Sequence, residues 1–312
     1  MARRAVAAAS LLILSAVACG RLPSARAPEA KVWYVASPST SPADPREPGF
    51  VYIDSASLRP VAAANDISLN DGVALFTNFH GARYHPESVR AIAEDSSVLT
   101  AFGAAFTRVA RAGDRALLID IQEMSPEDIP RMTAFVRTIA TAFRATRAAP
   151  VAIVVPAGDT VAYPTSVLGR IADLIVVRLT DEHRRGTRPG PLVTPEFIRR
   201  SLGSRANTIG ASRLGAELPL WGYMWNRDGS ARRITFRDAN DLVIRESGVF
   251  RRDPASSFLT ASGRDGWSIW VPDARTIRVL MDAALERGVS IVALAGTAGA
   301  DPAILAGASF KR

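Results

Sequence analysis

Short apolar runs alternate along the chain with longer stretches of helical spacing. The runs lie at residues 31–37, 65–70, 72–79, 116–122, 151–157, 173–181, 218–225 and 290–296, the second being the weakest. Continuous Val, Ile and Leu runs are typical of parallel strands that are covered on both faces. Eight of them in alternation with helices predict an α/β fold, the closed (β/α)8 TIM barrel. An open doubly wound sheet is the alternative, but no Gly-rich phosphate-binding loop follows the first run.

Two of the intervening stretches carry clear helix signals. The first spans residues 126–147, with Ser125 as its cap and Pro126 at its first position. The second begins near Ile277 and ends at Gly288. Both have apolar residues three or four positions apart, the spacing of one helix face. In a barrel of this kind the chemistry lies at the carboxyl ends of the strands, so those ends are where we look for a site.

The N-terminal residues predict an export signal with a lipid anchor. Two arginines precede an apolar stretch, residues 5–18, that is too short to span a bilayer comfortably. Cys19 then ends the sequence SAVAC, which resembles a bacterial lipobox whose cysteine is lipidated. We therefore expect residues 1–18 to be a lipoprotein signal peptide, residues 19–30 a polar tether, and residues 31–312 the barrel.

Composition narrows the compartment and the partners. Cys19 is the only cysteine, so no disulfide forms within one chain, and a buried small hydrophobe is the other interpretation of this residue. The formal net charge is +8, and nearly all of the basic residues are arginines. Because the excess is spread along an exported chain, we expect no nucleic-acid partner; an anionic wall polymer or lipid headgroups are the expected attraction. The expected protein is a monomer in the bacterial cell envelope, held at a membrane through its anchor.

No metal and no cofactor are expected. His80 and His85 are five positions apart and His183 is far along the chain, a set without metal-ligand spacing. The serines lack a nucleophile-elbow context, and the RGTRPGP segment at residues 185–191 matches no phosphate-binding loop.

Four segments are specific in their order and spacing. They are HPESVRAIAEDSSVLTAFGAAF at residues 85–106, ADLIVVRLTDEH with RPGPLVTPEFI at 172–198, LWGYMW at 220–225, and the stretch 267–302 that contains IWVPDARTI. Together they resemble glycoside hydrolase family 18, the chitinase-like barrels, and most closely its bacterial cell-wall branch. The resemblance implies a TIM barrel whose partner is an amino-sugar polysaccharide such as chitin, or peptidoglycan.

The resemblance also implies a mechanism. In the family, a glutamic acid at the end of the fourth strand, last in a D-x-x-D-x-D-x-E pattern, protonates the glycosidic oxygen, and the acetamido group of the substrate is the nucleophile. The acids before it hold its proton and orient the acetamido group. A tyrosine and an aspartate on the sixth strand assist, and a tryptophan on the eighth strand forms the floor of the pocket.

This chain departs from the family at most of these positions. The acidic pattern falls on Arg115, Leu118, Asp120 and Gln122. The sixth-strand pair falls on Thr180 and Asp181, and the eighth-strand tryptophan falls on Ala295. Asp120 and Asp181 therefore match the family, and the proton donor itself is missing.

Gln122 decides the expected activity. A carboxamide donates a hydrogen bond to a glycosidic oxygen but cannot release a proton to the leaving group, and a positioned general acid contributes roughly 10²- to 10⁴-fold. We therefore expect weak or no hydrolysis by the family mechanism. Glu123 is the fallback acid, but strand alternation directs it toward the helices or into the following loop unless a bulge turns it inward.

Arg178 stands at a position that is normally apolar in the family. It shares strand parity with Thr180, and Asp120 shares parity with Gln122, so both charges are expected inside the barrel. Because a buried charge without a partner costs several kcal/mol, we predict that Arg178 neutralises Asp120. Pairing of Arg178 with another acid, or its exposure to solvent, is the alternative.

Three aromatic residues alternate in one run. Trp221, Tyr223 and Trp225 are expected on one face of the seventh strand, where aromatic rings either stack on sugars or fill a core. With Thr180 they are the candidate substrate-binding residues.

The expected function combines these features. Asp120, Gln122 and Asp181 would supply polar contacts to an N-acetylglucosamine-containing glycan that is bound with weak or no hydrolysis. An active glycosidase that uses Glu123 or another acid is the first alternative. A structural or partner-binding envelope scaffold is the second, because a fold alone does not determine function.

Overall fold

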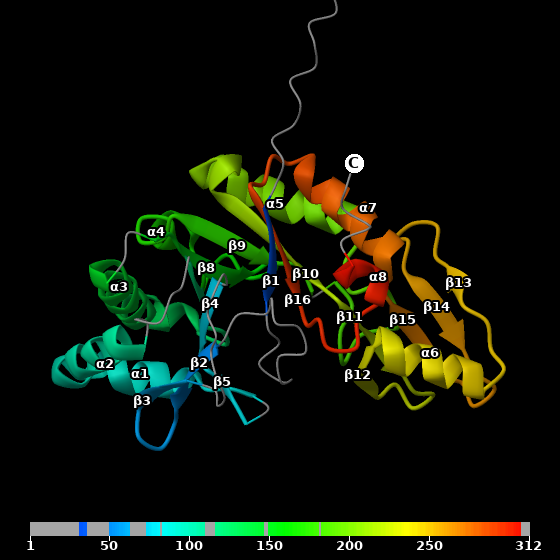
Figure 1. Cartoon of the computed structure of the whole chain (residues 1–312), viewed down its shortest axis with the longest axis horizontal. Coiled ribbons are helices and arrows are strands. Elements are labelled where there is room, and N and C mark those ends of the chain that lie inside the picture. The colour runs from blue at the N-terminus through cyan, green and yellow to red at the C-terminus, as the bar shows by residue number, and fades with distance from the viewer. Residues whose placement is uncertain are drawn as a thin grey trace, which may run out of the picture.

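The computed structural model describes residues 31–35, 50–62, 73–81, 83–109, 116–146, 149–180 and 182–306 of the 312-residue chain. Within these ranges nine strands form one curled sheet at the centre of Figure 1. In sheet order they are β1 (Lys31–Val35), β16 (Ile291–Ala295), β10 (Leu214–Pro219), β9 (Leu174–Arg178), β8 (Val151–Pro156), β7 (Ala116–Asp120), β4 (Val73–Thr77), β2 (Phe50–Asp54) and β3 (Arg59–Ala62). All neighbours are parallel except the β2–β3 hairpin. The eight parallel strands confirm the predicted TIM-barrel class.

The strand pattern differs from the prediction at two places. The structure has a parallel strand, β2, that the apolar runs did not predict, whereas the predicted run at residues 65–70 lies outside the described residues and stays a prediction. In β2 the buried Val51 and Ile53 alternate with half-buried neighbours, because the strand lies near the edge of the sheet. The run at 218–225 is also not one strand, since β10 ends at Pro219 and a separate strand follows.

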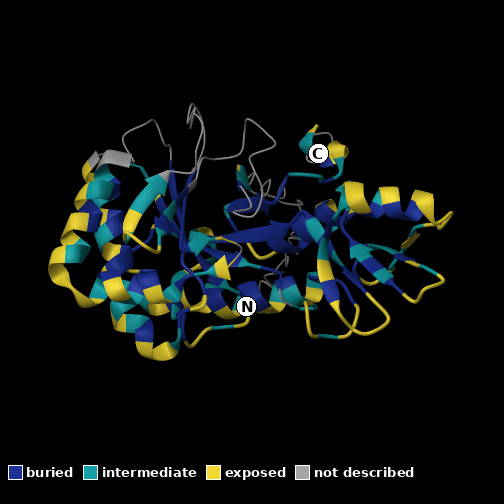
Figure 2. Ribbon diagram, turned by 90° about the horizontal axis from the view of Figure 1, so that it is seen from below, coloured by how far each residue is buried: buried dark blue, intermediate teal, exposed yellow. Residues whose placement is uncertain are grey.

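Helices cover the outer face of the barrel. They are α1 (Pro86–Glu94), α2 (Ser96–Val109), α3 (Ile129–Thr146), α4 (Thr165–Leu168), α5 (Pro195–Ile209), α7 (Ala274–Leu285) and α8 (Pro302–Leu305), with the 3-10 turns η1 (Pro126–Asp128) and η2 (Ala211–Arg213). Figure 2 shows the result, with buried strands inside and helices whose outward faces are exposed. No helix among the described residues has the length and apolar character that a membrane crossing requires.

Both predicted helices are confirmed. The turn η1 runs directly into α3, and the Ser125 hydroxyl donates to the Asp128 carboxylate over 2.6 Å at its start. In α7 the predicted face, which includes Ile277 and Leu280, is buried. Gly288 follows α7 with a φ of 75°, a left-handed conformation that glycine adopts without strain.

A second, smaller sheet is inserted between β10 and α7, at the right of Figure 1. Among the described residues its strands are β11 (Trp221–Trp225), β12 (Ala231–Thr235), β13 (Arg251–Arg252), β14 (Leu259–Ser262) and β15 (Ser268–Val271), all antiparallel, and α6 (Phe236–Arg245) packs on them. Gly222 makes the pairing of β11 with β15 possible. A Cβ at this position would stand 1.9 Å from the Trp270 carbonyl oxygen.

Strand alternation divides the barrel side chains into two layers. On β7, Leu117 and Ile119 pack in the cluster that contacts the helices, whereas Leu118 packs inside the barrel with residues of β8, β9 and β16. Asp120 has the parity of Leu118, so its side chain enters the barrel interior at the carboxyl end of the strand. A short hairpin of β5 (Phe79–His80) and β6 (Arg83–Tyr84) follows β4 at this end.

Candidate functional site

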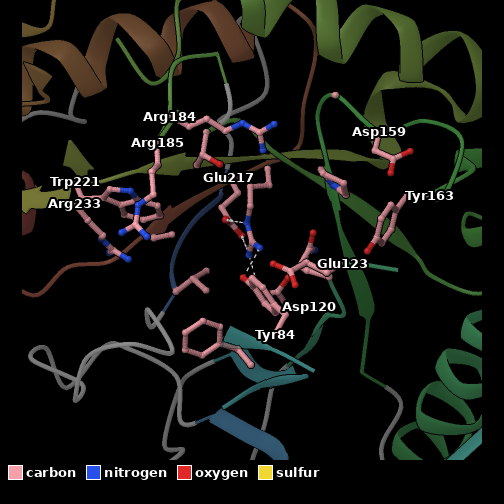
Figure 3. Close-up of a pocket in the computed structure, with 18 of the residues that line it drawn as sticks. Tyr84, Asp120, Glu123, Asp159, Tyr163, Arg184, Arg185, Glu217, Trp221 and Arg233 are labelled. Carbon is pink, nitrogen blue, oxygen red and sulfur yellow. Dashed lines mark hydrogen bonds and ion pairs between the residues drawn. The ribbon is translucent and has the colours of Figure 1, made fainter. Parts of the chain in front are cut away.

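A cavity of about 950 Å³ lies at the carboxyl ends of the barrel strands (Figure 3). Eight charged residues line it, namely Asp120, Glu123, Asp159, Glu217, Arg178, Arg184, Arg185 and Arg233. They come from strand ends, from the loops that follow strands, and from the inserted sheet. The cavity therefore occupies the end of the barrel at which TIM barrels carry their sites.

Arg178 is at the centre of a buried ion network. Its Nη2 donates to Asp120 Oδ2 over 2.8 Å, its Nε donates to Glu217 Oε1 over 2.6 Å, and its Nη1 donates to the Tyr84 hydroxyl over 2.9 Å. The Asp120 and Glu217 side chains are each 1% exposed, and that of Arg178 is 16% exposed. The predicted pairing of Arg178 with Asp120 is confirmed, and Glu217 is a second carboxylate partner that the sequence analysis missed.

The sheet register explains this network. Arg178 and Glu217 are direct neighbours across the parallel pair β9 and β10, and both face the barrel interior. Asp120 ends β7, two strands away from β9. The long arginine side chain spans this gap, and Tyr84 reaches the guanidinium group from the β5–β6 hairpin.

Electrostatics keep the network in one charge state at neutral pH. Burial acts to lower the pKa of Arg178, but the carboxylates of Asp120 and Glu217 outweigh it, so the pKa lies well above its usual value. Burial also raises the pKa of the Tyr84 hydroxyl well above its usual range, although Arg178 opposes this shift. The guanidinium group therefore stays charged and the phenol stays neutral.

Gln122, at the position of the family's acid, donates to Asp120. The Gln122 Nε2 lies 2.8 Å from Asp120 Oδ1, and the residue is 6% exposed. The buried Asn78 side chain fixes the backbone here, because it accepts from the Gln122 N–H over 2.9 Å and donates to the Gln122 carbonyl over 3.0 Å. Both oxygens of Asp120 are thus occupied, one by the amide and one by Arg178.

Glu123 lies in the loop after β7, as strand alternation predicts, but its side chain lines the cavity. Its φ of 61° is in the left-handed region, which is uncommon for a residue other than glycine. The residue is exposed, and Figure 3 shows it beside Asp120. Backbone outliers of this kind gather at functional sites, so Glu123 is a candidate acid on geometric grounds.

The aromatic residues divide between two environments. Trp221 and Tyr223 line the cavity and are half-buried. The guanidinium carbon of Arg233 lies 3.7 Å from the centre of the Trp221 ring, a cation–π contact that covers one face of the indole. All three belong to the inserted sheet rather than to the seventh barrel strand.

The prediction that Trp225 binds a sugar is wrong. Trp225 is 1% exposed, and its Nε1 donates to the Thr187 carbonyl over 3.1 Å. Because the ring is buried, it has no face open to a ligand. Trp225 holds the loop after β9 against β11.

The loop between β8 and α4 adds Asp159 and Tyr163 to the cavity wall. Arg205 of α5, 1% exposed, holds this loop by donating to the Pro156, Asp159 and Tyr163 carbonyls and to the Thr165 hydroxyl. Burial lowers the pKa of Arg205 to about 10, so it remains charged at neutral pH. Arg205 thus fixes two cavity residues without reaching the cavity itself.

The remaining predicted residues are only partly described. Thr180 is 8% exposed and lines the cavity. Arg115, Asp181 and Cys19 lie outside the described residues, and the roles given to Asp181 and Cys19 stay predictions. Across the described ranges, no three histidine, cysteine or acidic side chains converge as metal ligands.

The fold is a TIM barrel with a small inserted sheet, and chitinases are among the solved structures that resemble it. A chitinase from Chromobacterium violaceum has a TM-score of 0.74 with this chain, covers 89% of this chain and 97% of its own, and is 17% identical. The spore cortex-lytic enzyme SleL of Bacillus cereus has a TM-score of 0.73, with 90% of this chain and 74% of its own covered at 15% identity. The resemblance noted in the sequence is confirmed at the level of the fold.

Sequence comparison finds a glycosylase-type relative. The uncharacterized glycosylase YvbX of Bacillus subtilis (strain 168) is 25% identical over 198 residues, which are 56% of this chain. The match spans 56% of the length of YvbX, little more than half of that protein. No family model matches the chain.

Proposed function

We propose that this chain binds an N-acetylglucosamine-containing glycan in the barrel cavity and hydrolyses it weakly or not at all. The chitinase-like fold supports a glycan ligand, and the cavity volume of about 950 Å³ lies in the range of small-molecule sites. Trp221 and Tyr223 offer aromatic surface at the wall, and Gln122 and Thr180 offer polar contacts.

The observation that carries the proposal is the Asp120–Arg178–Glu217 network. The family mechanism, as the resemblance implies it, requires an acid at position 122 and a neighbouring aspartate that holds its proton and orients the acetamido group. Here Asp120 accepts from Gln122 and from Arg178 instead. Because the amide has no proton to release and the carboxylate is already occupied, that route lacks two of its working groups.

The test compares binding with turnover in the same preparation. The purified protein is titrated with the N-acetylglucosamine tetramer by calorimetry, and the mixture is then separated to detect shorter products. Saturable binding without products is expected. Product release at the rate of a chitinase assayed alongside, or the absence of any binding, would contradict the proposal.

Tyr223→Ala shows whether the sugar occupies this cavity. Loss of its aromatic surface is expected to weaken binding about tenfold, since a stacked ring contributes roughly 1–3 kcal/mol when a ligand covers it. Tyr52→Ala is the matched control, because Tyr52 is half-buried and stacks on His80 away from the cavity lining. The affinity of the Tyr52→Ala variant for the tetramer should equal that of the unmodified protein.

A glycosidase that uses Glu123 is the second candidate, because Glu123 lines the cavity with a left-handed backbone. If products do form, Glu123→Gln should abolish them. Glu127→Gln, which alters an exposed acid four positions along the chain, should leave them unchanged. Turnover that survives Glu123→Gln would exclude Glu123 as the acid.

The location is proposed from the sequence alone. Residues 1–18 and the cysteine that follows support export and lipid anchoring at Cys19, which would place the barrel at the surface of a membrane in the cell envelope.

A further inference from the structure

The arginines of the cavity that are not part of the buried network gather toward one end. Arg184, Arg185 and Arg233 line the cavity together with Trp221. Figure 3 shows Arg185 and Arg233 beside Trp221 on the left, the Arg184 side chain above them and nearer the middle, and Asp159 on the right. Arg178 does not add to this cluster, because two carboxylates neutralise it. The charges of the cavity are therefore separated along its length.

Two remote parts of the chain build this basic end. Arg184 and Arg185 follow β9, and Arg233 lies on β12 of the inserted sheet. The Arg185 Nε donates to the Ala231 carbonyl of β12 over 3.2 Å, and the bond from Trp225 to the Thr187 carbonyl ties the same loop to β11. These contacts hold the loop arginines beside the strand that carries Arg233.

Arg184 and Arg185 have guanidinium N–H groups that are available to a ligand. Within the described part of the chain, the Arg184 side chain and the two Nη atoms of Arg185 donate to no protein group, and neither residue forms an ion pair. Both residues are exposed. Each guanidinium group therefore keeps a pair of parallel N–H donors for a ligand, the geometry that suits a carboxylate.

Arg233 is held in a fixed orientation. Its guanidinium group lies on the Trp221 ring and packs closely over Gly296, where an added Cβ would stand 2.7 Å from Arg233 Nη2. Burial lowers the pKa of Arg233 to about 10, and the group remains charged at neutral pH. A partly buried cation interacts more strongly with an anion than a solvated one does.

We propose that Arg184, Arg185 and Arg233 form a subsite for the carboxylate of an acidic sugar residue in the bound glycan. The inference rests on the proposed function, because the sugar must enter the same cavity. The subsite specifies the class of glycan that the cavity binds, namely an anionic polymer and not neutral chitin. Trp221 and Tyr223 provide the apolar wall against which the ring of the acidic sugar lies.

The test compares two tetrasaccharides that differ in charge. The hyaluronan tetrasaccharide alternates glucuronic acid with N-acetylglucosamine, and the N-acetylglucosamine tetramer is neutral. Calorimetric titration of the unmodified protein should show about tenfold or greater preference for the acidic tetramer, the gain that one charge-assisted bidentate contact implies. Raising the salt concentration from about 50 mM to 500 mM should reduce this preference, because salt screens exposed charges.

Variants assign the preference to the basic end. Arg185→Gln and Arg233→Gln should each remove most of this preference. Arg185→Gln leaves the contact between Arg233 and Trp221 in place and should therefore keep the affinity for the neutral tetramer. Arg188→Gln and Arg232→Gln are the matched controls, because these exposed arginines lie on the same loop and strand but do not line the cavity. Thermal unfolding of each variant shows whether it is folded. If Arg233→Gln is unstable, Arg185→Gln still tests the subsite, because Arg185 is exposed and its substitution should not affect folding.

Each outcome decides the assignment. Equal affinity for the two tetramers, in the unmodified protein and in all variants, overturns the subsite and leaves the proposed function standing. Inorganic phosphate or acetate that binds as tightly as the acidic tetramer overturns the assignment to a sugar. Binding of neither tetramer overturns the subsite together with the proposed function.

Discussion

Arg178→Met removes the cation of the buried network while keeping an unbranched side chain in its place. The variant loses the contacts of 2.8 Å to Asp120, 2.6 Å to Glu217 and 2.9 Å to Tyr84. Two carboxylates, each 1% exposed, then remain inside the barrel without their shared partner. Such a pair is destabilising because each charge lacks solvation and both have the same sign.

The expected loss of stability is large for one substitution. Breaking a buried ion pair by removing one partner costs about 3–5 kcal/mol. A domain is stable by about 5–15 kcal/mol in total, so the variant should fold with a small margin. In a domain near this size, each kcal/mol of lost stability lowers Tm by about 2–4 °C, so the expected loss lowers Tm by roughly 6–20 °C.

Urea unfolding followed by tryptophan fluorescence measures the effect, and Arg232→Met is the control. Arg232 is exposed on β12, so its loss should change stability by less than about 0.5 kcal/mol. The triple variant Arg178→Met, Asp120→Asn, Glu217→Gln carries no charge in the network and should recover most of the loss. A loss below about 1 kcal/mol in the single variant, or a triple variant no more stable than the single one, would refute the electrostatic reasoning.

Four further outcomes are expected. Gln122→Glu should raise hydrolysis of the N-acetylglucosamine tetramer by less than about tenfold, because Asp120 remains bound to Arg178. Product assays measure this gain, and a gain of about 10²-fold or more would contradict the prediction. Arg205→Met should destabilise the protein by about 2–4 kcal/mol and speed amide hydrogen exchange in the loop after β8, whereas unchanged exchange there would exclude a positioning role. Asp128→Asn tests a pH dependence of stability. The hydrogen bond and charge of Arg90 hold the pKa of Asp128 well below its usual range. The Arg90–Asp128 pair therefore stabilises the fold above about pH 4, and this contribution is lost as the pH falls further. The variant should therefore lose about 2 kcal/mol at pH 7 and approach the parent protein near pH 2 in urea unfolding, and a constant difference would refute the linkage. Cys19→Ala should abolish lipid labelling and membrane association of the expressed protein, and membrane association that persists would refute the anchor.

The barrel was predictable because most of its strands are covered on both faces. Strands β7, β8, β9 and β16 read as continuous apolar runs since one face meets the helices and the other fills the barrel interior. Strand β2 lies near the edge of the sheet, so buried and half-buried residues alternate along it and it does not form a continuous run of Val, Ile and Leu. The boundary between the barrel strand β10 and the inserted strand β11 lies within the apolar run at 218–225. The sequence does not mark it, because strands buried in a barrel and strands buried in an inserted sheet contain the same apolar residue types.

The candidate site was predictable only where local geometry determines it. Strand parity placed Asp120 and Arg178 in the barrel interior, and the confirmed ion pair follows from that. Glu217 was missed because its pairing depends on the register between β9 and β10, although an acid inside the run LGAELPL was a usable signal. Parity also grouped Trp225 with Trp221, but it carries no information about the burial of Trp225 or about its hydrogen bond to the loop after β9.

Arg178 and the amide at Gln122 are consistent with each other in electrostatic terms. A general acid at position 122 needs a neighbouring carboxylate that raises its pKa, as two like charges in one site do. In this chain Arg178 lies 2.8 Å from Asp120 and compensates that charge, so a glutamate at position 122 would lose much of this support. A neutral amide needs no such support, because it donates to Asp120 without having to hold a proton of its own. Under the proposed function, the amide at position 122 and Arg178 would together replace the groups that acid catalysis needs. They would leave an inner cavity wall that is hydrogen-bonded, an arrangement that would favour binding a glycan over cleaving it.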